Sequence, residues 1–231
     1  MKWLLNALSS SVGKKFLMAI TGLLLCGFLV AHLAGNLLLP AGGDLFNDYA
    51  KKLHENEGLL MVAETGLAVI FALHLWFAVS LTWGNGKARG KGYAKTESKR
   101  EDAIATAGLR PDKWMIGSGI VLLLFIVLHL FDFKLHRLGT DDVLNSIRAT
   151  DEQPVTTEEA IHVLNSPLTR IGYVAGFIFL FAHLSHGVSS AFQSLGLSHP
   201  KYNSLIKYGG LAFAGLVSLG FFVVLVWATR L

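Results

Sequence analysis

Long apolar runs alternate with shorter polar segments along the 231-residue chain. Five runs stand out, covering Phe16–Leu39, Leu59–Trp83, Trp114–Phe133, Thr169–Leu195 and Tyr208–Thr229. Each is near or above the roughly 20 residues that an α-helix needs to cross about 30 Å of hydrocarbon. Strands of a membrane β-barrel would be about ten residues long and would alternate apolar with polar residues. The pattern therefore predicts an all-α integral membrane protein, one domain over residues 1–231 with five transmembrane helices.

The polar segments between the runs add detail. The longest, residues 134–168, predicts two short helices outside the membrane, the second of which begins with a Thr156-x-x-Glu159 capping box and ends before Pro167. The Gly- and Lys-rich segment between the second and third runs is expected to lie flat on the membrane surface. The first run is too long for a cleavable signal peptide, and no small-residue cleavage site follows it.

Composition agrees with a membrane protein and narrows the chemistry. Only 16% of the residues are charged and 52% are hydrophobic, whereas a soluble domain carries roughly 25% charged residues. This balance excludes a disordered chain and a basic nucleic-acid-binding protein. The single cysteine, Cys26, excludes an internal disulfide and an iron–sulfur cluster held by this chain alone, because such a cluster needs about four thiolates.

Basic residues are divided unevenly between the two sides of the predicted bundle. Thirteen of the 20 lysines and arginines fall in the N-terminal, second and fourth polar segments, together with four acidic residues. The opposite side has the other seven basic residues and the other twelve acidic ones. Because cytoplasmic loops of membrane proteins are enriched in Lys and Arg, we expect the N-terminus in the cytoplasm and the C-terminus outside.

Histidines lie where ionisable side chains are rare. Five of the nine histidines fall within the first four runs, namely His32, His74, His129 and the His183/His186 pair. Ionisable groups inside a bilayer are costly and usually mark function. At 1.5 Å per residue, His32 and His129 lie roughly 7 and 8 Å outward of the middle of their runs. On the same scale His74 lies roughly 5 Å toward the cytoplasm, and His183 and His186 lie roughly 2 and 6 Å toward it.

These depths define two layers, an outer pair of His32 with His129 and an inner pair of His74 with His183 or His186. Two such pairs from four helices match two stacked haems, because a low-spin haem iron takes one imidazole on each ring face. Depth leaves the choice between His183 and His186 open and slightly favours His186. Hydrogen bonding between helices is the alternative role for such histidines. A bare metal ion is less favoured, because no carboxylate, second cysteine or H-x₃-H cluster accompanies them.

Two sequence blocks carry a family resemblance. The first run reads G-K-K-F-L-M-A-I-T-G-L and then H-L-A-G-N-L-L between Gly13 and Leu38, and the fourth reads F-A-H-L-S-H-G-V-S-S-A-F-Q-S-L-G from Phe181 to Gly196. The less specific blocks A-L-H-L-W and L-H-L-F-D surround His74 and His129. Over nearly its whole length, the chain resembles the five-helix, dihaem cytochrome b subunit of succinate dehydrogenases and fumarate reductases.

The resemblance implies that the first four helices form a bundle around two stacked b haems. It implies that His32 and His129 ligate the outer haem, and that His74 and His183 ligate the inner one. It favours His183 over His186 as the inner ligand. His186 would then contact a ligating side chain or a haem propionate. Three residues just outside the third run are candidates to neutralise outer propionates, with anchoring at the membrane edge as the alternative: Lys134, His136 and Arg137.

The same resemblance implies a respiratory role in the bacterial inner (cytoplasmic) membrane. Flavoprotein and iron–sulfur partner subunits would sit on the cytoplasmic face. They would carry the succinate–fumarate chemistry, because this chain has no Rossmann-like glycine fingerprint for a flavin. This chain would pass electrons between the iron–sulfur subunit and a lipid quinone, with menaquinone expected by analogy with two-haem relatives.

A quinone site needs a side chain that exchanges protons with the carbonyl oxygens. Glu64 is interpreted as the only carboxylate well inside a run. It lies toward the outer end of the second run and is a candidate for an outer quinone site or proton pathway. A carboxylate at a water-accessible helix start is the alternative. Further candidates are Asp44, Asp48 and Lys51 in the loop after the first run, and an inner pocket near Ser10, Ser11 and Lys15.

Two other functions stay open. A haem b subunit of another quinone-reactive enzyme, such as nitrate reductase or formate dehydrogenase, also uses membrane histidine pairs but concentrates them on fewer helices. A transporter or a scaffold without haem is the other alternative. Transporters tend to show inverted repeats and broken helices, and the sequence displays neither.

Overall fold

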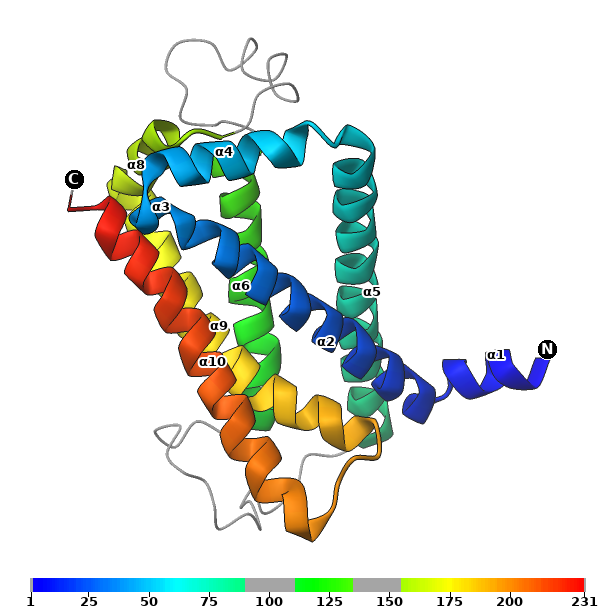
Figure 1. The fold of residues 1–231 in the computed structure, drawn as a ribbon. Helices are drawn as coiled ribbons and strands as arrows, with labels where there is room; N and C mark the ends of the chain where they lie inside the picture. The colour runs from blue at the N-terminus through cyan, green and yellow to red at the C-terminus, as the bar shows by residue number, and fades with distance from the viewer. Residues whose placement is uncertain (1, 90–110, 135–154, 231) are drawn as a thin grey trace.

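The fold is α-helical throughout the residues that the structure describes. We analysed a computed structural model, which describes residues 2–89, 111–134 and 155–230 (Figure 1). No strand occurs in these three ranges. The helices, in chain order, are α1 (Lys2–Ser9), α2 (Ser11–Asn36), α3 (Leu38–Ala41), α4 (Gly43–His54), α5 (Glu57–Arg89), α6 (Pro111–Phe133), α8 (Thr157–Asn165), α9 (Pro167–Ser194) and α10 (Pro200–Ala228).

Five of these segments are long and apolar enough to cross a membrane: α2 continued by α3, α5, α6, α9 and α10. The prediction of an all-α chain with five membrane-spanning helices is confirmed in this sense. The last helix begins well before the predicted run, at Pro200. A proline suits the first turn of a helix, because it lacks the N–H that would stay unbonded there. His199 caps this start, since its Nδ1 accepts from the backbone N–H of Lys201 at 3.2 Å.

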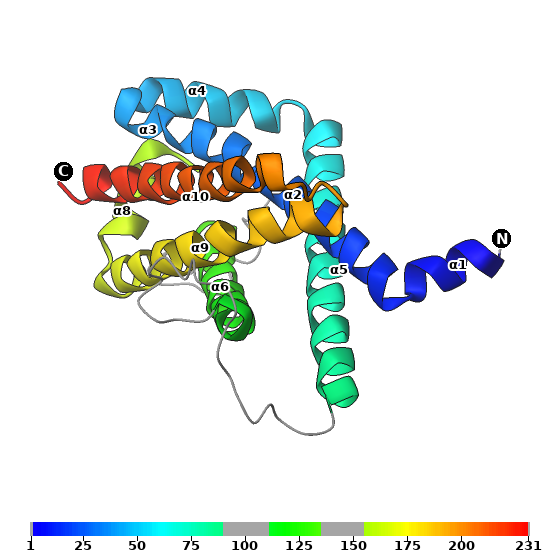
Figure 2. The ribbon, with the colours of Figure 1, turned by 90° about the horizontal axis from the view of Figure 1, so that it is seen from below.

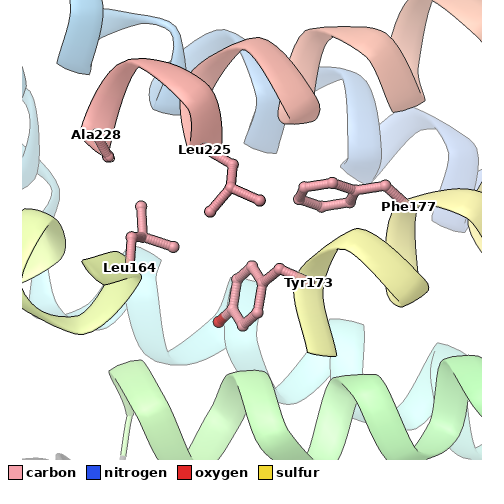
Figure 3. Close-up of a cluster of buried hydrophobic side chains, with 5 residues drawn as sticks. All are labelled: Leu164, Tyr173, Phe177, Leu225 and Ala228. Carbon is pink, nitrogen blue, oxygen red and sulfur yellow. The ribbon is translucent and has the colours of Figure 1, made fainter. Parts of the chain in front are cut away.

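The core is built around α9, which packs most extensively on α10 and also contacts α6 and α2. One apolar cluster joins α8, α9 and α10 and contains Leu164, Tyr173, Phe177, Leu225 and Ala228 (Figure 3). A second cluster on α9 and α10 contains Leu180, Leu184, Ala214 and Val217. Because α9 has neighbours on several sides, side chains along it can face more than one helix.

Helix α5 stands apart from the rest of the bundle. It packs along α2 and meets α4, whereas contacts of this extent with α6, α9 or α10 are absent among the described residues (Figure 1, Figure 2). In its most apolar 18-residue window, 0% of the residues are buried. Its half-buried positions include Leu67, Ile70, His74, Phe77 and Leu81, which recur at helical spacing. Helix α5 is therefore held mainly by this stripe against α2.

The connection after the first span is helical, because α3 and α4 occupy it. They are joined at Gly42, whose φ of 157° is more accessible to glycine than to other residues. Helix α4 crosses one end of the bundle from α3 to α5 (Figure 1). Phe46 and Ala50 lie one turn apart on it, and Ala50 is buried. The many polar residues of α4 concealed this short amphipathic pattern.

The prediction of a capped helix before the fourth span is confirmed. Thr156 caps α8, since its Oγ1 accepts from the backbone N–H of Glu159 at 3.3 Å, and the helix ends before Pro167. Helix α8 docks on α4, because Thr157 Oγ1 donates to the carbonyl oxygen of Gly43 at 3.0 Å. We call this part of the bundle the α4–α8 end. The first of the two predicted short helices, and most of the Gly- and Lys-rich segment, lie outside the described residues.

Candidate cofactor-binding site formed by two histidine pairs

His32 on α2 and His129 on α6 lie side by side toward the α4–α8 end, and we call them the outer pair. Their ring centroids are 5.7 Å apart, and the ring planes are inclined at 79°. Two imidazoles on opposite faces of one metal ion, with metal–nitrogen bonds of about 2 Å, have ring centres about 6 Å apart. The spacing of the outer pair therefore suits a metal ion held between the two rings.

Aromatic side chains surround the outer pair. Phe28 stacks on His32 with centroids 5.2 Å apart, and Phe221 of α10 approaches the same ring at 5.7 Å. Phe125 lies 6.1 Å from the ring of His129. A porphyrin needs apolar surroundings of this kind in addition to its axial ligands.

The Nδ1 atoms of the outer pair face polar groups. The hydroxyl of Tyr173, on α9, lies 2.9 Å from His129 Nδ1 and points out of the apolar cluster toward α6 (Figure 3). Asn36 Nδ2 lies 3.4 Å from His32 Nδ1 and donates to the His32 carbonyl oxygen at 2.8 Å. Metal-bound histidines usually make a hydrogen bond with the ring nitrogen that does not bind the metal. The Tyr173 contact favours Nε2 of His129 as the ligating atom, whereas the donating amide of Asn36 does not assign a ligating nitrogen to His32.

His74 on α5 and His183 on α9 are the two residues predicted as the inner pair, and each has its own polar neighbour. Thr21 on α2 places its Oγ1 3.2 Å from His74 Nδ1. Ser118 on α6 places its Oγ 3.1 Å from His183 Nδ1. In all four rings, then, the nitrogen that meets a neighbouring polar side chain is Nδ1.

His186, one turn beyond His183 on α9, is held differently. Its Nε2 lies 3.1 Å from the hydroxyl of Ser190 on the same helix. The depth of the two residues slightly favours His186 as the inner ligand, whereas the sequence resemblance favours His183. The contacts favour His183, because its ring is oriented by a different helix through Nδ1, while the Nε2 atom of His186 faces a hydroxyl of its own helix.

The outer pair offers two imidazoles, which is the number of axial ligands that a bis-histidine haem iron takes. Within the described ranges, no group of three or more His, Cys, Asp or Glu residues converges on one point. A zinc ion takes three or four ligands from the protein, whereas a haem iron with two axial imidazoles takes only two. Two separate pairs of histidines match the second requirement.

An ion pair joins α5 to the end of α6 near the α4–α8 end. Lys134 Nζ lies 3.0 and 3.1 Å from the carboxylate oxygens of Glu64. The two side chains are 47% and 49% exposed, so the pair contributes at most about 1 kcal/mol to stability. Lys134 thus contacts a quinone candidate. His136 and Arg137, the other candidates for propionate contacts, lie outside the described residues.

The remaining quinone candidates lie near the two ends of the bundle. Asp44, Asp48 and Lys51 are exposed on α4, and therefore on a helix rather than in a loop. At the opposite end Ser10 caps α2, because its Oγ accepts from the backbone N–H of Gly13 at 3.1 Å. Ser11 and Lys15 are exposed there. All of these side chains are exposed to solvent.

Asp132, on α6, was missed by the sequence interpretation. It is 1% exposed, and its Oδ2 lies 3.5 Å from the hydroxyl of Thr169, which is 0% exposed. Glu64 is the candidate that the sequence placed within a span, whereas Asp132, near the end of α6, is the more deeply buried carboxylate of the two. The sequence feature that could have revealed Asp132 is its position three residues after His129, which places both residues on one face of α6.

The chain was also compared with known proteins. No family model matches it, no curated protein matches it, and no solved structure matches it. The observations that bear on function are therefore the five apolar helices, the two histidine pairs and the polar side chains around them.

Proposed function

We propose that this chain is the membrane-anchor cytochrome b subunit of a succinate:quinone oxidoreductase, either a succinate dehydrogenase or a fumarate reductase. One observation carries the proposal. Helices α2, α5, α6 and α9 each contribute one imidazole, and the imidazoles of α2 and α6 lie with their ring centroids 5.7 Å apart. The resemblance of the first and fourth spans to that family supports the same assignment.

The residues of this chain would bind two b haems and keep them apart from water. His32 and His129 would supply the axial ligands of the outer haem, and His74 and His183 would supply those of the inner one. Bound haem would supply reversible one-electron transfer. Phe28, Phe125 and Phe221 would provide apolar contacts beside the outer group.

The proposal places the flavoprotein and iron–sulfur subunits on the cytoplasmic face of a bacterial inner membrane. The support is the distribution of basic residues, which favours a cytoplasmic N-terminus. The inner pair would then lie nearer to the iron–sulfur partner, and the outer pair nearer to the far side. Electrons would pass between the partner and a membrane quinone, which we expect to be menaquinone.

Co-purification tests this function. The chain, carrying an affinity tag, is extracted from its native membrane in a mild detergent and its partners are identified. We expect a flavoprotein and an iron–sulfur protein, together with succinate- or fumarate-dependent electron exchange with a menaquinone analogue. Partners belonging to another quinone-reactive enzyme, or a colourless chain without partners, would contradict the proposal.

Glu64 is expected to serve quinone chemistry at the α4–α8 end. Its carboxylate is accessible and lies beside Lys134, so it can exchange a proton with water and with a bound quinone. A Glu64→Gln variant keeps the size of the side chain but cannot take up a proton at neutral pH. We expect quinone turnover to fall at least about a hundredfold, the lower end of the usual range for a proton-transfer group, with both haems retained. Glu158→Gln on α8, an exposed glutamate outside the candidate quinone site, is the matched control, and turnover equal to wild type in Glu64→Gln would remove Glu64 from the site.

A further inference from the structure

The inner pair is contacted by two hydroxyls that occupy equivalent places on different helices. Thr21, on α2, faces Nδ1 of His74, on α5, at 3.2 Å. Ser118, on α6, faces Nδ1 of His183, on α9, at 3.1 Å. In both cases the hydroxyl comes from the helix that packs beside the histidine. The same arrangement therefore occurs twice, once for each imidazole of the pair.

Each of the two hydroxyls also lies close to a carbonyl oxygen of its own helix, which bears on the direction of its contact with the histidine. Thr21 Oγ1 lies 2.9 Å from the carbonyl oxygen of Leu17, and Ser118 Oγ lies 3.0 Å from that of Met115. A carbonyl oxygen only accepts, so the single proton of each hydroxyl can bond within its own helix. The hydroxyl oxygen is then available to accept from Nδ1–H of the histidine. A neutral ring with its proton on Nδ1 carries its lone pair on Nε2, the atom that binds a metal.

Burial makes these contacts significant. Thr21 is 6% exposed and Ser118 is 3% exposed. A buried N–H that lost its acceptor would cost about 1–3 kcal/mol, so each hydroxyl favours one tautomer and one orientation of its histidine. Glycine follows both residues: a Cβ on Gly22 would lie 3.3 Å from His74 Cε1, and one on Gly119 would lie 3.7 Å from His183 Cε1. The Gly22 contact is the tighter of the two, so α2 and α6 differ in how closely they approach the rings.

The outer pair lacks this arrangement. Its Nδ1 atoms meet a phenol, from Tyr173, and an amide, from Asn36. The Asn36 NH₂ group only donates, and a phenol can act as donor or acceptor. The inner pair therefore differs from the outer pair in the kind of side chain that meets each Nδ1 atom.

We propose that Thr21 and Ser118 are positioning residues of the inner pair, each accepting from Nδ1–H and thereby presenting the Nε2 lone pair of His74 and His183 to the inner haem. This inference rests on the proposed function. Acceptance from Nδ1–H also makes the imidazole a better electron donor, which favours the oxidised iron. Both hydroxyls therefore influence the affinity for the inner haem and its midpoint potential.

The test uses Thr21→Val, which keeps the shape of threonine, and Ser118→Ala, both in the purified full complex. We expect the midpoint potential of the inner haem to rise and the largest g-value in its electron paramagnetic resonance spectrum to shift. The outer haem should be unchanged. Transfer of the inner haem to excess apomyoglobin should show an affinity about 10–100-fold lower, the usual cost of losing such a partner.

Two further variants separate positioning from general stability. Thr21→Ser restores a hydroxyl and should restore the potential and the spectrum. Thr82→Val removes a threonine hydroxyl whose contact, with the Ala78 carbonyl oxygen at 2.7 Å, stays within α5, and it should leave both haems as in wild type.

The outcomes distinguish this inference from the proposed function. A wild-type complex without haem would overturn the proposed function and this inference with it. Two haems in the wild type, with inner-haem potential, spectrum and affinity unchanged in both Thr21→Val and Ser118→Ala, would overturn only the positioning role. Equal changes in Thr82→Val would overturn it too, because they would show a general effect of losing a helix hydroxyl.

Discussion

Replacing His129 with alanine is expected to lower the haem content from about two per chain to about one. The outer haem would lose one of its two axial ligands, and Phe125 and Tyr173 would pack around an empty position. The inner haem should remain, because its ligands are on α5 and α9. Haem per chain is measured by the pyridine haemochrome assay, and redox titration shows which of the two components is lost.

The partner histidine gives a second check on the same pair. His32→Ala should remove the same component as His129→Ala, and the double variant should lose no more, because the two residues act on one group. His54→Ala is the control, since the contact of its ring is with the carbonyl oxygen of Ala50 within α4. If the histidines only hydrogen-bonded between helices, His129→Ala would cost about 1 kcal/mol of stability and leave absorbance unchanged.

Replacing His183 with alanine is expected to remove the inner haem, whereas His186→Ala should retain both haems. The two residues are one turn apart on the same helix, so each variant has nearly the same effect on helix propensity and membrane insertion. They differ in contacts: His183 Nδ1 faces Ser118 of α6, and His186 Nε2 faces Ser190 of α9 itself.

In these two variants, the rate of electron transfer to quinone should depend on whether the inner haem is retained. Succinate-dependent quinone reduction should fall at least about a hundredfold in His183→Ala, because one of two electron carriers is missing. Reduction of a soluble dye by the partner subunits should continue. His186→Ala should lower quinone reduction by less than about threefold on the same reasoning. Loss of the inner haem in His186→Ala and its retention in His183→Ala would reverse the ligand assignment.

The five spans were predictable from sequence because about 20 apolar residues in a row have few stable solutions other than a membrane helix. The pairing of His32 with His129 was an expectation from depth alone, and the structure brings these two rings to 5.7 Å. Depth follows from the fixed rise of a helix and needs no knowledge of packing.

Other features depend on how each helix is rotated about its own axis, and the hydrophobic periodicity of this sequence does not determine that rotation. Thr21 and Ser118 look like ordinary helix hydroxyls that bond to their own backbone, as Thr82 does, until the neighbouring helices are placed. Whether Asp132 faces the interior depends likewise on how α6 packs on α9. Helix α4 was missed for a different reason, because its polar residues outweigh a short apolar stripe.

The central claim is that four imidazoles hold two haems inside this chain, and haem stoichiometry tests it most directly. The intact complex is purified from its native membrane, and haem b is measured against the amount of this polypeptide. The account predicts about two haems b per chain with low-spin, bis-histidine spectra. A purified complex that contains this chain but shows no b-type absorbance would contradict it.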